Sequence, residues 1–333
     1  MKIKSQLLRH FSEIATMWQC ETGWIQTDSE LGITTLTISK DSNWYILSSF
    51  SQYKTINAQF QLTDFRRALP SLRGMVEITI SDVSMAIGTT VIPIITNSFI
   101  ASPYIPGWGQ SITIDGHKWN DFMEKIQHYT NIIGQQDIFN GLLIDGSKNT
   151  TALVASNGNG LYYYNTEEPA NGVRAMIPFR LALSWSTVEE FNITFYQNSV
   201  HFSSKGETLI GQILSFTFPD YIQLIENKYT QTFSFKSEDF LFVKKLKSRI
   251  IDIRFHEKDM YMEWMGAWEK KEESGDKKIP ATCTNTGIKG FYRSILLPLC
   301  NAGEIVTVST DDKNSKFKTT IGGFTYVFSG RND

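Results

Sequence analysis

Histidine and carboxylate side chains are the residue types in this sequence most suited to catalysis, but their spacing does not assemble a reactive centre. The histidines are scattered along the chain, at His10, His117, His128, His201 and His256. They form no HExxH zinc pair and no spacing typical of a nucleophilic triad. Asp311 and Asp312 fall in a predicted hairpin turn, where solvated acidic residues are common. The sequence therefore predicts a protein that is not an enzyme. Only a pocket of converging acidic and basic residues would support the alternative that the protein is an enzyme.

The three cysteines, Cys20, Cys283 and Cys300, are odd in number and form no CxxC pair. They indicate neither a disulfide framework nor a zinc site, so we expect no metal and no cofactor. No run of 18 apolar residues predicts a membrane span. Residues 1–18 place their apolar side chains at helical spacing, which is not typical of a signal peptide. We therefore expect a cytoplasmic protein with no membrane partner.

The elements that would position any site repeat along the chain at a period of roughly a hundred residues. In each copy a longer helix precedes one hairpin and a shorter helix precedes another, and the strands alternate apolar and polar residues. Two helices on one face of an antiparallel sheet make a compact α+β domain. The predicted helix pairs are 5–18 with 62–74, 117–133 with 177–190, and 237–249 with 290–303.

The length of 333 residues and the hydrophobic content of 41% suit two or three domains with proper cores. Breaks are predicted in the Pro/Gly-rich segment 102–111 and near 226–232, and the charged segment 269–280 is predicted to be a loop. The sequence thus predicts three α+β domains, 1–110, 111–228 and 229–333. Three equivalent domains suit a ring, although a repeated-domain binding protein without a ring would show the same repetition.

Charge is distributed unevenly between the predicted helices and the rest of the chain. The total is −2, yet the ranges 2–18, 64–73, 117–133, 178–187, 237–249 and 289–301 together carry +9, which leaves −11 elsewhere. Helices that share one surface would make that surface attractive to phosphates, although basic residues are also ordinary on solvated helices. The candidate phosphate contacts are Lys4, Arg9, Arg66, Arg67, Arg73, Lys118, Lys125, Arg180, Lys244, Lys245, Lys247, Lys289 and Arg293.

The stretch from Phe139 to Tyr221 carries a resemblance to a known family. Asn140 to Ile144 reads NGLLI, 154–161 reads VASNGNGL, and 218–221 reads FPDY. The end of the chain, 324–331, reads FTYVFSGR. These pieces resemble the bacterial sliding clamp, the beta subunit of DNA polymerase III, and their spacing within the middle third is similar to that of the family.

The resemblance implies a non-enzymatic ring that encircles double-stranded DNA without reading its sequence and tethers DNA polymerase, a clamp loader and other replication or repair proteins. It also implies a pocket for short partner peptides. The sequence departs from the family at Asn159-Gly160 and at 328–330, so the accepted peptide is expected to differ, and a phage or mobile-element origin would suit this divergence. The implied pocket residues are Phe139, Ser156, Gly158, Asn159, Gly160, Leu161, Leu224, Val327, Phe328 and Arg331.

The family clamp is a head-to-tail homodimer, in which the first domain of one chain pairs with the third domain of the other. By position, the resemblance assigns Ile92 and Ile94 to one side of this interface and Leu241 and Leu246 to the other. A head-to-tail contact that closes generates a ring. The alternative that the sequence leaves open is a monomeric clamp-fold protein, for instance a decoy that binds clamp-interacting peptides.

Overall fold

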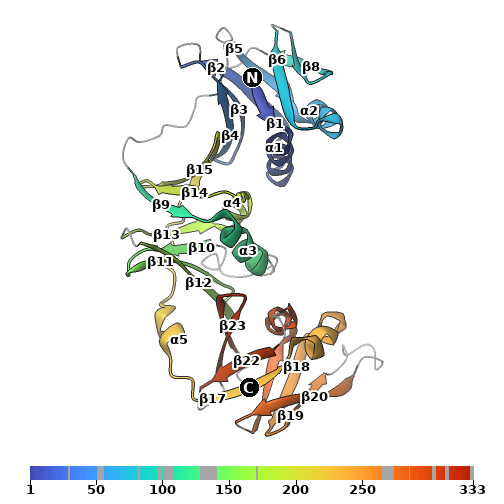
Figure 1. Cartoon of the computed structure of the whole chain (residues 1–333), viewed down its shortest axis with the longest axis vertical. Helices are drawn as coiled ribbons and strands as arrows, with labels where there is room; N and C mark the ends of the chain where they lie inside the picture. Colours follow the sequence, from blue (N-terminus) through green and yellow to red (C-terminus); the bar gives the residue numbers. More distant parts are fainter. Residues whose placement is uncertain are drawn as a thin grey trace. The chain divides into compact units, whose positions relative to one another are not determined.

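The structure is a computed structural model of the whole chain. It divides into two compact units, one of Met1–Asn120 with Ile177–Leu214 and one of Asp121–Met176 with Ser215–Asp333. Figure 1 shows their elements. The described residues are 1–28, 31–50, 56–81, 83–96, 100, 109–127, 141–169, 172–264, 274–284, 286–301, 305–311 and 315–330.

The first unit is built on one sheet of twelve strands, in the order β1-β6-β7-β8-β5-β2-β3-β4-β16-β15-β14-β9. Every pairing given for this sheet is antiparallel, and the β4–β16 pair, with Leu47 opposite Glu207, joins strands distant in sequence. Its strands are β1 (Lys2–Lys4), β2 (Thr22–Asp28), β3 (Ile33–Lys40), β4 (Asn43–Phe50), β5 (Ile56–Gln61), β6 (Met75–Ile80), β7 (Ser84–Ile87), β8 (Thr90–Thr96), β9 (Gln110–Ile114), β14 (Phe191–Phe195), β15 (Ser199–Ser204) and β16 (Glu207–Gln212).

The second unit is built on another antiparallel sheet, in the order β13-β10-β11-β12-β24-β23-β22-β17-β20-β19-β18-β21. The β12–β24 pair joins strands that are distant in sequence, as the β4–β16 pair does in the first unit. Its strands are β10 (Gly141–Asp145), β11 (Thr150–Ser156), β12 (Gly160–Pro169), β13 (Arg174–Pro178), β17 (Gln231–Lys236), β18 (Ile250–His256), β19 (Asp259–Trp264), β20 (Gly275–Cys283), β21 (Gly287–Tyr292), β22 (Ile305–Thr310), β23 (Lys316–Ile321) and β24 (Phe324–Ser329).

The order of helices and strands along the chain repeats, as the sequence predicts. One strand, one helix and three strands follow each other six times along the described chain, with only the short α5 added after the fourth copy. The α+β class and the repeated helix–hairpin pattern are therefore confirmed. The helices are α1 (Ser5–Met17), α2 (Leu62–Ala68) with η1 (Leu69–Ser71), α3 (Gly116–Ile126), α4 (Phe179–Leu183), α5 (Ile222–Glu226), η4 (Ser237–Lys245), and α6 (Arg293–Leu296) with η6 (Leu297–Asn301).

Aromatic side chains fill the cores beneath these helices. In the first unit, Phe11 of α1 lies 5.4 Å from Phe65 of α2, measured between ring centroids. Trp119 of α3 is fully buried, and its ring nitrogen donates to the backbone oxygen of Trp185 at 3.1 Å. In the second unit, Tyr162 and Tyr326 stack at 4.6 Å across the β12–β24 pair. Aromatic side chains thus pack neighbouring helical segments together in the first unit and join β12 to β24 in the second.

The third predicted pair of helices differs most from the structure. The sequence predicts an α-helix over 237–249, whereas η4 is a 3-10 helix that ends at Lys245. Its buried residues, Ser237, Phe240 and Val243, recur every three positions, which matches the three residues per turn of a 3-10 helix. Aromatic and β-branched side chains also lower α-helix propensity. The type and the end of this element are therefore corrected.

Two further sequence predictions are wrong in detail. The predicted helix over 289–301 begins only at Arg293, because Gly287–Tyr292 forms β21 beside β18. The predicted loop over 269–280 contains the start of β20, where Gly275–Pro280 pair with β19. Asp276 and Lys278 are exposed on one face of β20, whereas Lys277 on the other face is half-buried, with Nζ 4.3 Å from the centre of the Phe242 ring.

One buried histidine of the first unit is expected to make the stability of the protein depend on pH. His201 of β15 is 5% exposed, packs 4.5 Å from the Tyr196 ring, and has Nε2 within 3.3 Å of Ser199 Oγ. Burial lowers the pKa of His201 from 6.5 to about 4. Between pH 6.5 and pH 4 the imidazole of His201 is protonated in the unfolded chain but stays neutral in the native state. The contribution of His201 to the free energy of unfolding is therefore complete above pH 6.5 and is lost as the pH falls toward 4. The linked loss at pH 5 is about 2 kcal/mol.

We therefore expect the melting temperature of the protein to fall between pH 7 and pH 5, and the fall to be smaller in His201→Gln. Differential scanning calorimetry at both pH values measures this difference. The matched control is His256→Gln on β18, because His256 is exposed. An equal pH dependence in wild type and His201→Gln would show that His201 titrates normally.

Candidate nucleic-acid and partner sites

The basic residues predicted to contact phosphates lie mostly near helix ends. Within the helical bounds of the structure, the net charge of the six elements that match the predicted helices is +3 instead of +9. Six basic residues lie outside those bounds, and they are Lys2, Lys4, Arg73, Lys247, Arg249 and Lys289. The predicted helical placement of Lys4, Arg73, Lys247 and Lys289 is therefore wrong. Lys4 ends β1, and the aliphatic chain of Lys289 in β21 lies against Gly330.

Several arginines that were predicted to contact phosphates donate hydrogen bonds to backbone oxygens of the chain itself. Arg9 donates to the backbone oxygen of Leu72 at 2.7 Å, and Arg73 donates to those of Pro70 and Leu72. Arg293 donates to the backbone oxygens of Val243 and Lys244 at 2.8 and 2.5 Å. Such bonds satisfy carbonyls at helix ends and hold the guanidinium groups in place. These arginines stabilise the helix termini and keep only part of their donor capacity for phosphates.

The other predicted phosphate contacts differ in their exposure. Arg180 of α4 donates to the backbone oxygen of Met17, and Arg67 pairs with Asp64 at 2.9 Å. Arg66 and Lys125 are half-buried and Lys118 is exposed. The densest exposed cluster is Lys244, Lys245 and Lys247, at the end of η4. This cluster, called the η4 lysines below, places three positive charges within four residues of the chain.

The predicted partner pocket contains a tight turn between β11 and β12. Gly158 adopts a φ of 84°, which favours glycine. The side chain of Asn157 accepts from the backbone nitrogens of Asn159 and Gly160 at 3.1 and 2.8 Å. Ser156 Oγ donates to Gly160 O at 3.0 Å. Sequence reasoning missed the organising role of Asn157, although the Asn-Gly pair is a turn signal.

The turn is continuous with the end of the chain. Gly160 lies opposite Phe328 and Leu161 opposite Val327 in the β12–β24 pair. The backbone nitrogen of Ser329 donates to Asn159 O at 3.0 Å. The structure therefore brings 159–161 and 327–329 together, although these residues are far apart in sequence. Phe139 and Arg331 lie outside the described residues.

Burial changes which of these residues a partner can touch. The side chains of Leu161, Val327 and Phe328 are at most 4% exposed. The Phe328 ring packs 5.3 Å from Phe317 and belongs to the aromatic core. Gly158 and Asn159 are exposed and Leu224 of α5 is half-buried. In this conformation the accessible part of the predicted pocket is the turn together with α5.

The FPDY segment positions α5. Tyr221 is buried, and its hydroxyl donates to Asp145 Oδ2 at 3.1 Å, while burial raises the pKa of Tyr221. Asp220 accepts from the backbone nitrogen of Ile222 at 3.1 Å at the start of α5. A cleft of about 120 Å³ separates α5 from β10–β12, and Tyr163, Ile222 and Ile225 are among its walls. Sequence reasoning missed this cleft because only folding brings α5 to that sheet face.

Two strands have partly open edges at the predicted dimer interface. β8 pairs with β7 over Thr90–Pro93 but with β5 only at Ile94 and Thr96. Likewise, in the described chain β20 has no second partner strand over Gly275–Pro280, which pairs with β19 alone. An open strand edge can accept a strand of another chain.

The side chains predicted for the dimer interface, and their neighbours on β8, differ in exposure. Ile92 is 2% exposed and faces the core, and Ile94 is half-buried. The outward apolar side chains of β8 are Val91 and Ile95, which are 65% and 43% exposed. Leu241 of η4 is 45% exposed, and Leu246, the residue that follows η4, is half-buried.

This repeated α+β architecture is the sliding-clamp fold. The solved structures that it matches over the whole chain include bacterial DNA polymerase III beta subunits. The Pseudomonas aeruginosa subunit matches with a TM-score of 0.81 and 15% identity over all of both chains. The Borrelia burgdorferi subunit matches with a TM-score of 0.83 and 10% identity over 99% of this chain and 98% of that one.

The Helicobacter pylori beta clamp, bound to a DNA ligase peptide, matches with a TM-score of 0.77 and 15% identity over 100% of this chain and 99% of that one. At such identities the likeness is one of fold. No family model and no curated protein matches the sequence. Every helix in the described ranges is too short or too polar to cross a membrane.

Proposed function

We propose that this chain is a DNA sliding clamp, a processivity factor that encircles duplex DNA and tethers a DNA polymerase and other replication proteins. The observation that carries the proposal is the agreement of the fold with bacterial beta subunits along the entire chain. Such a protein acts by enclosing the DNA duplex, so its function needs no catalytic residue. The proposed domains are 1–110, 111–228 and 229–333, each holding two of the six strand–helix–strand repeats.

The open edges of β8 and β20 support a head-to-tail homodimer. An isolated open edge is an aggregation hazard, whereas mutual pairing of two such edges in a closed ring removes it. Exposed Val91 and Ile95 on one edge, and exposed Leu241 on η4, would then become buried. The ring would contain six domains.

Loose contact with phosphates fits the exposed lysines better than tight docking. The η4 lysines carry their charge on long side chains in solvent, which favours salt-sensitive binding without base contacts. Partner proteins would dock on the turn at 156–160, on Leu224 and on the adjoining end of β24. Asn159 and Gly160 would make the accepted peptide differ from that of other clamps.

A monomeric clamp-fold protein that binds clamp-interacting peptides is the second candidate. The observation that favours it is the modest positive charge of the helices, which is +3 within their observed bounds. Such a protein would keep the turn and α5 but would not need closed edges. Size-exclusion chromatography with light scattering at micromolar concentration distinguishes a dimer from this monomer.

The proposed function predicts retention that depends on DNA topology. Protein assembled on nicked circular DNA is expected to co-elute with the circle in gel filtration, because a closed ring cannot leave an endless duplex. Cutting the circle once with a restriction enzyme should release most of the protein, since the ring slides off a free end. Equal retention on circular and linear DNA would contradict a topological mechanism.

A further inference from the structure

A wide groove lies within the first unit and shares no residue with the turn, α5 and β24 that form the predicted partner pocket. Its volume is about 780 Å³, and it is lined by β1, the first turns of α1, the end of β4, the segment after α4 and the β15–β16 turn. We call it the α1 groove and define it by Lys2, Lys4, Leu7, Phe50, Met75 and Val188.

The walls of the α1 groove carry an unusual concentration of exposed apolar side chains. Phe50 at the end of β4 is 84% exposed, Met75 at the start of β6 is 60% exposed, and Val188 after α4 is 63% exposed. Half-buried Leu7 and Ile33 also line the groove. Large apolar side chains gathered in one concave surface are typical of a site that another molecule covers.

One side of the α1 groove is positively charged. Lys2 and Lys4 are exposed, and neither forms an ion pair within 4 Å with a carboxylate of the described chain. Lys4 is also the N-cap of α1, which has no side-chain cap and no acidic residue in its first turn. The partial positive charge of the helix start therefore adds to the lysines.

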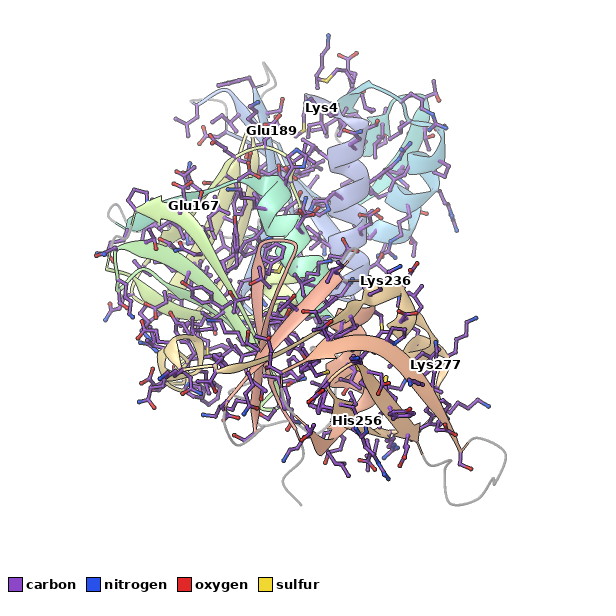
Figure 2. The ribbon with its side chains drawn as sticks, turned by 60° about the horizontal axis from the view of Figure 1, so that its bottom comes forward. Lys4, Glu167, Glu189, Lys236, His256 and Lys277 are labelled. Carbon is purple, nitrogen blue, oxygen red and sulfur yellow. The ribbon has the colours of Figure 1, made fainter. Side chains whose placement is uncertain are left out.

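The acidic residues of the α1 groove are largely engaged elsewhere. Glu189 pairs with Lys205 at 2.8 Å and lies near Lys4, as Figure 2 shows. Glu207 is 8% exposed and accepts from the hydroxyl of Tyr45, and burial raises the pKa of Glu207. The accessible charge beside the apolar walls is thus that of Lys2 and Lys4.

We propose that the α1 groove docks an acidic peptide segment of a partner protein. Apolar anchors of the segment lie against Phe50, Met75 and Val188, and its carboxylates lie near Lys2, Lys4 and the start of α1. The apolar walls favour a peptide over bare DNA, because phosphates gain nothing from Phe50 or Val188. The site shares no residue with the predicted partner pocket and does not depend on closure of a ring.

The test uses full-length protein and a fluorescein-labelled peptide, EEIVDWIE, with KKIVKWIK as the charge-reversed counterpart. In fluorescence anisotropy the acidic peptide should bind, and the lysine peptide should bind at least about tenfold more weakly because it is repelled by Lys2 and Lys4. The variant Lys2→Glu/Lys4→Glu should raise the Kd of the acidic peptide at least about fivefold. Phe50→Ser/Val188→Ser should raise it about tenfold or more.

The matched control is Lys228→Glu/Lys258→Glu, which reverses two exposed lysines of the second unit and should leave the Kd unchanged. All substituted side chains are exposed, and circular dichroism confirms that each variant folds. Absence of acidic-peptide binding at 1 mM peptide (an upper limit of about 4 kcal/mol for the binding free energy) would overturn the proposal. Equal binding of both peptides would also overturn it, and so would loss of duplex binding with unchanged peptide binding in Lys2→Glu/Lys4→Glu.

Discussion

The variant Val91→Asp/Ile95→Asp is expected to be a folded monomer that circular DNA no longer retains. Both side chains are exposed on the open edge of β8, so their replacement costs the isolated chain little. In a head-to-tail dimer they would be buried at both contacts, where burying each one contributes about 1.5–3 kcal/mol. Two added carboxylates per contact would also lose hydration. Light scattering measures the mass, and gel filtration with nicked circles measures retention.

A mixing experiment sharpens this prediction. Leu241→Asp would damage the other side of the same contact, so a mixture with Val91→Asp/Ile95→Asp contains one intact contact per pair of chains. Dimer mass should return in the mixture, but retention on circles should not, because the second contact stays open. The control Leu31→Asp/Phe216→Asp changes two exposed apolar residues that belong to none of β8, η4 and β20. A fully dimeric, retained Val91→Asp/Ile95→Asp protein would remove β8 from the interface.

Reversal of the η4 lysines is expected to have the second large effect. Lys244→Glu/Lys245→Glu/Lys247→Glu changes the charge of one short surface by six units. Each lost phosphate contact lowers the slope of log K against log salt by about 0.9, so the slope should fall by about 2.7 if all three lysines act. DNA association at low salt should weaken at least about tenfold. Anisotropy of a labelled duplex at several salt concentrations measures both quantities.

The control reverses three other lysines of the same unit, Lys148, Lys228 and Lys316. Lys228 precedes β17 and Lys316 begins β23, whereas η4 follows the far end of β17, and Lys148 lies between β10 and β11. The overall charge change is identical, so a general electrostatic effect would weaken both variants equally. A larger loss in the control would place the DNA-facing surface elsewhere. Lys236 and Lys277, which Figure 2 labels, are left unchanged because they contact η4 or its neighbours.

Local patterns in the sequence predicted the elements well where one face of an element is buried. Alternation of apolar residues located the hairpins, and helical spacing located α1 and α3. Prediction failed at η4, because a spacing of three in Ser237, Phe240 and Val243 is close to the spacing of an α-helix. It failed at β21 because the pairing of this strand with β18, which is distant in sequence, decides its structure.

Local sequence patterns were equally limited in predicting the candidate sites. The motifs located the turn at 156–160 and the FPDY segment before α5. They did not reveal that Phe328 and Ile92 face the core, because aromatic and branched residues suit both a binding surface and a packed interior. The α1 groove was also unforeseen, since Phe50, Met75 and Val188 come from three distant segments.

The sequence by itself determined a repeated α+β chain, the resemblance to sliding clamps, and an excess of basic residues near its helices. These properties follow from periodicity, motif spacing and charge, which are all local along the chain. Only the tertiary structure decided which side chains remain exposed and which arginines are engaged by backbone carbonyls. The physical reason is that exposure depends on which sheet, helix or strand edge covers a residue, and long-range pairings such as β4–β16 and β12–β24 decide this.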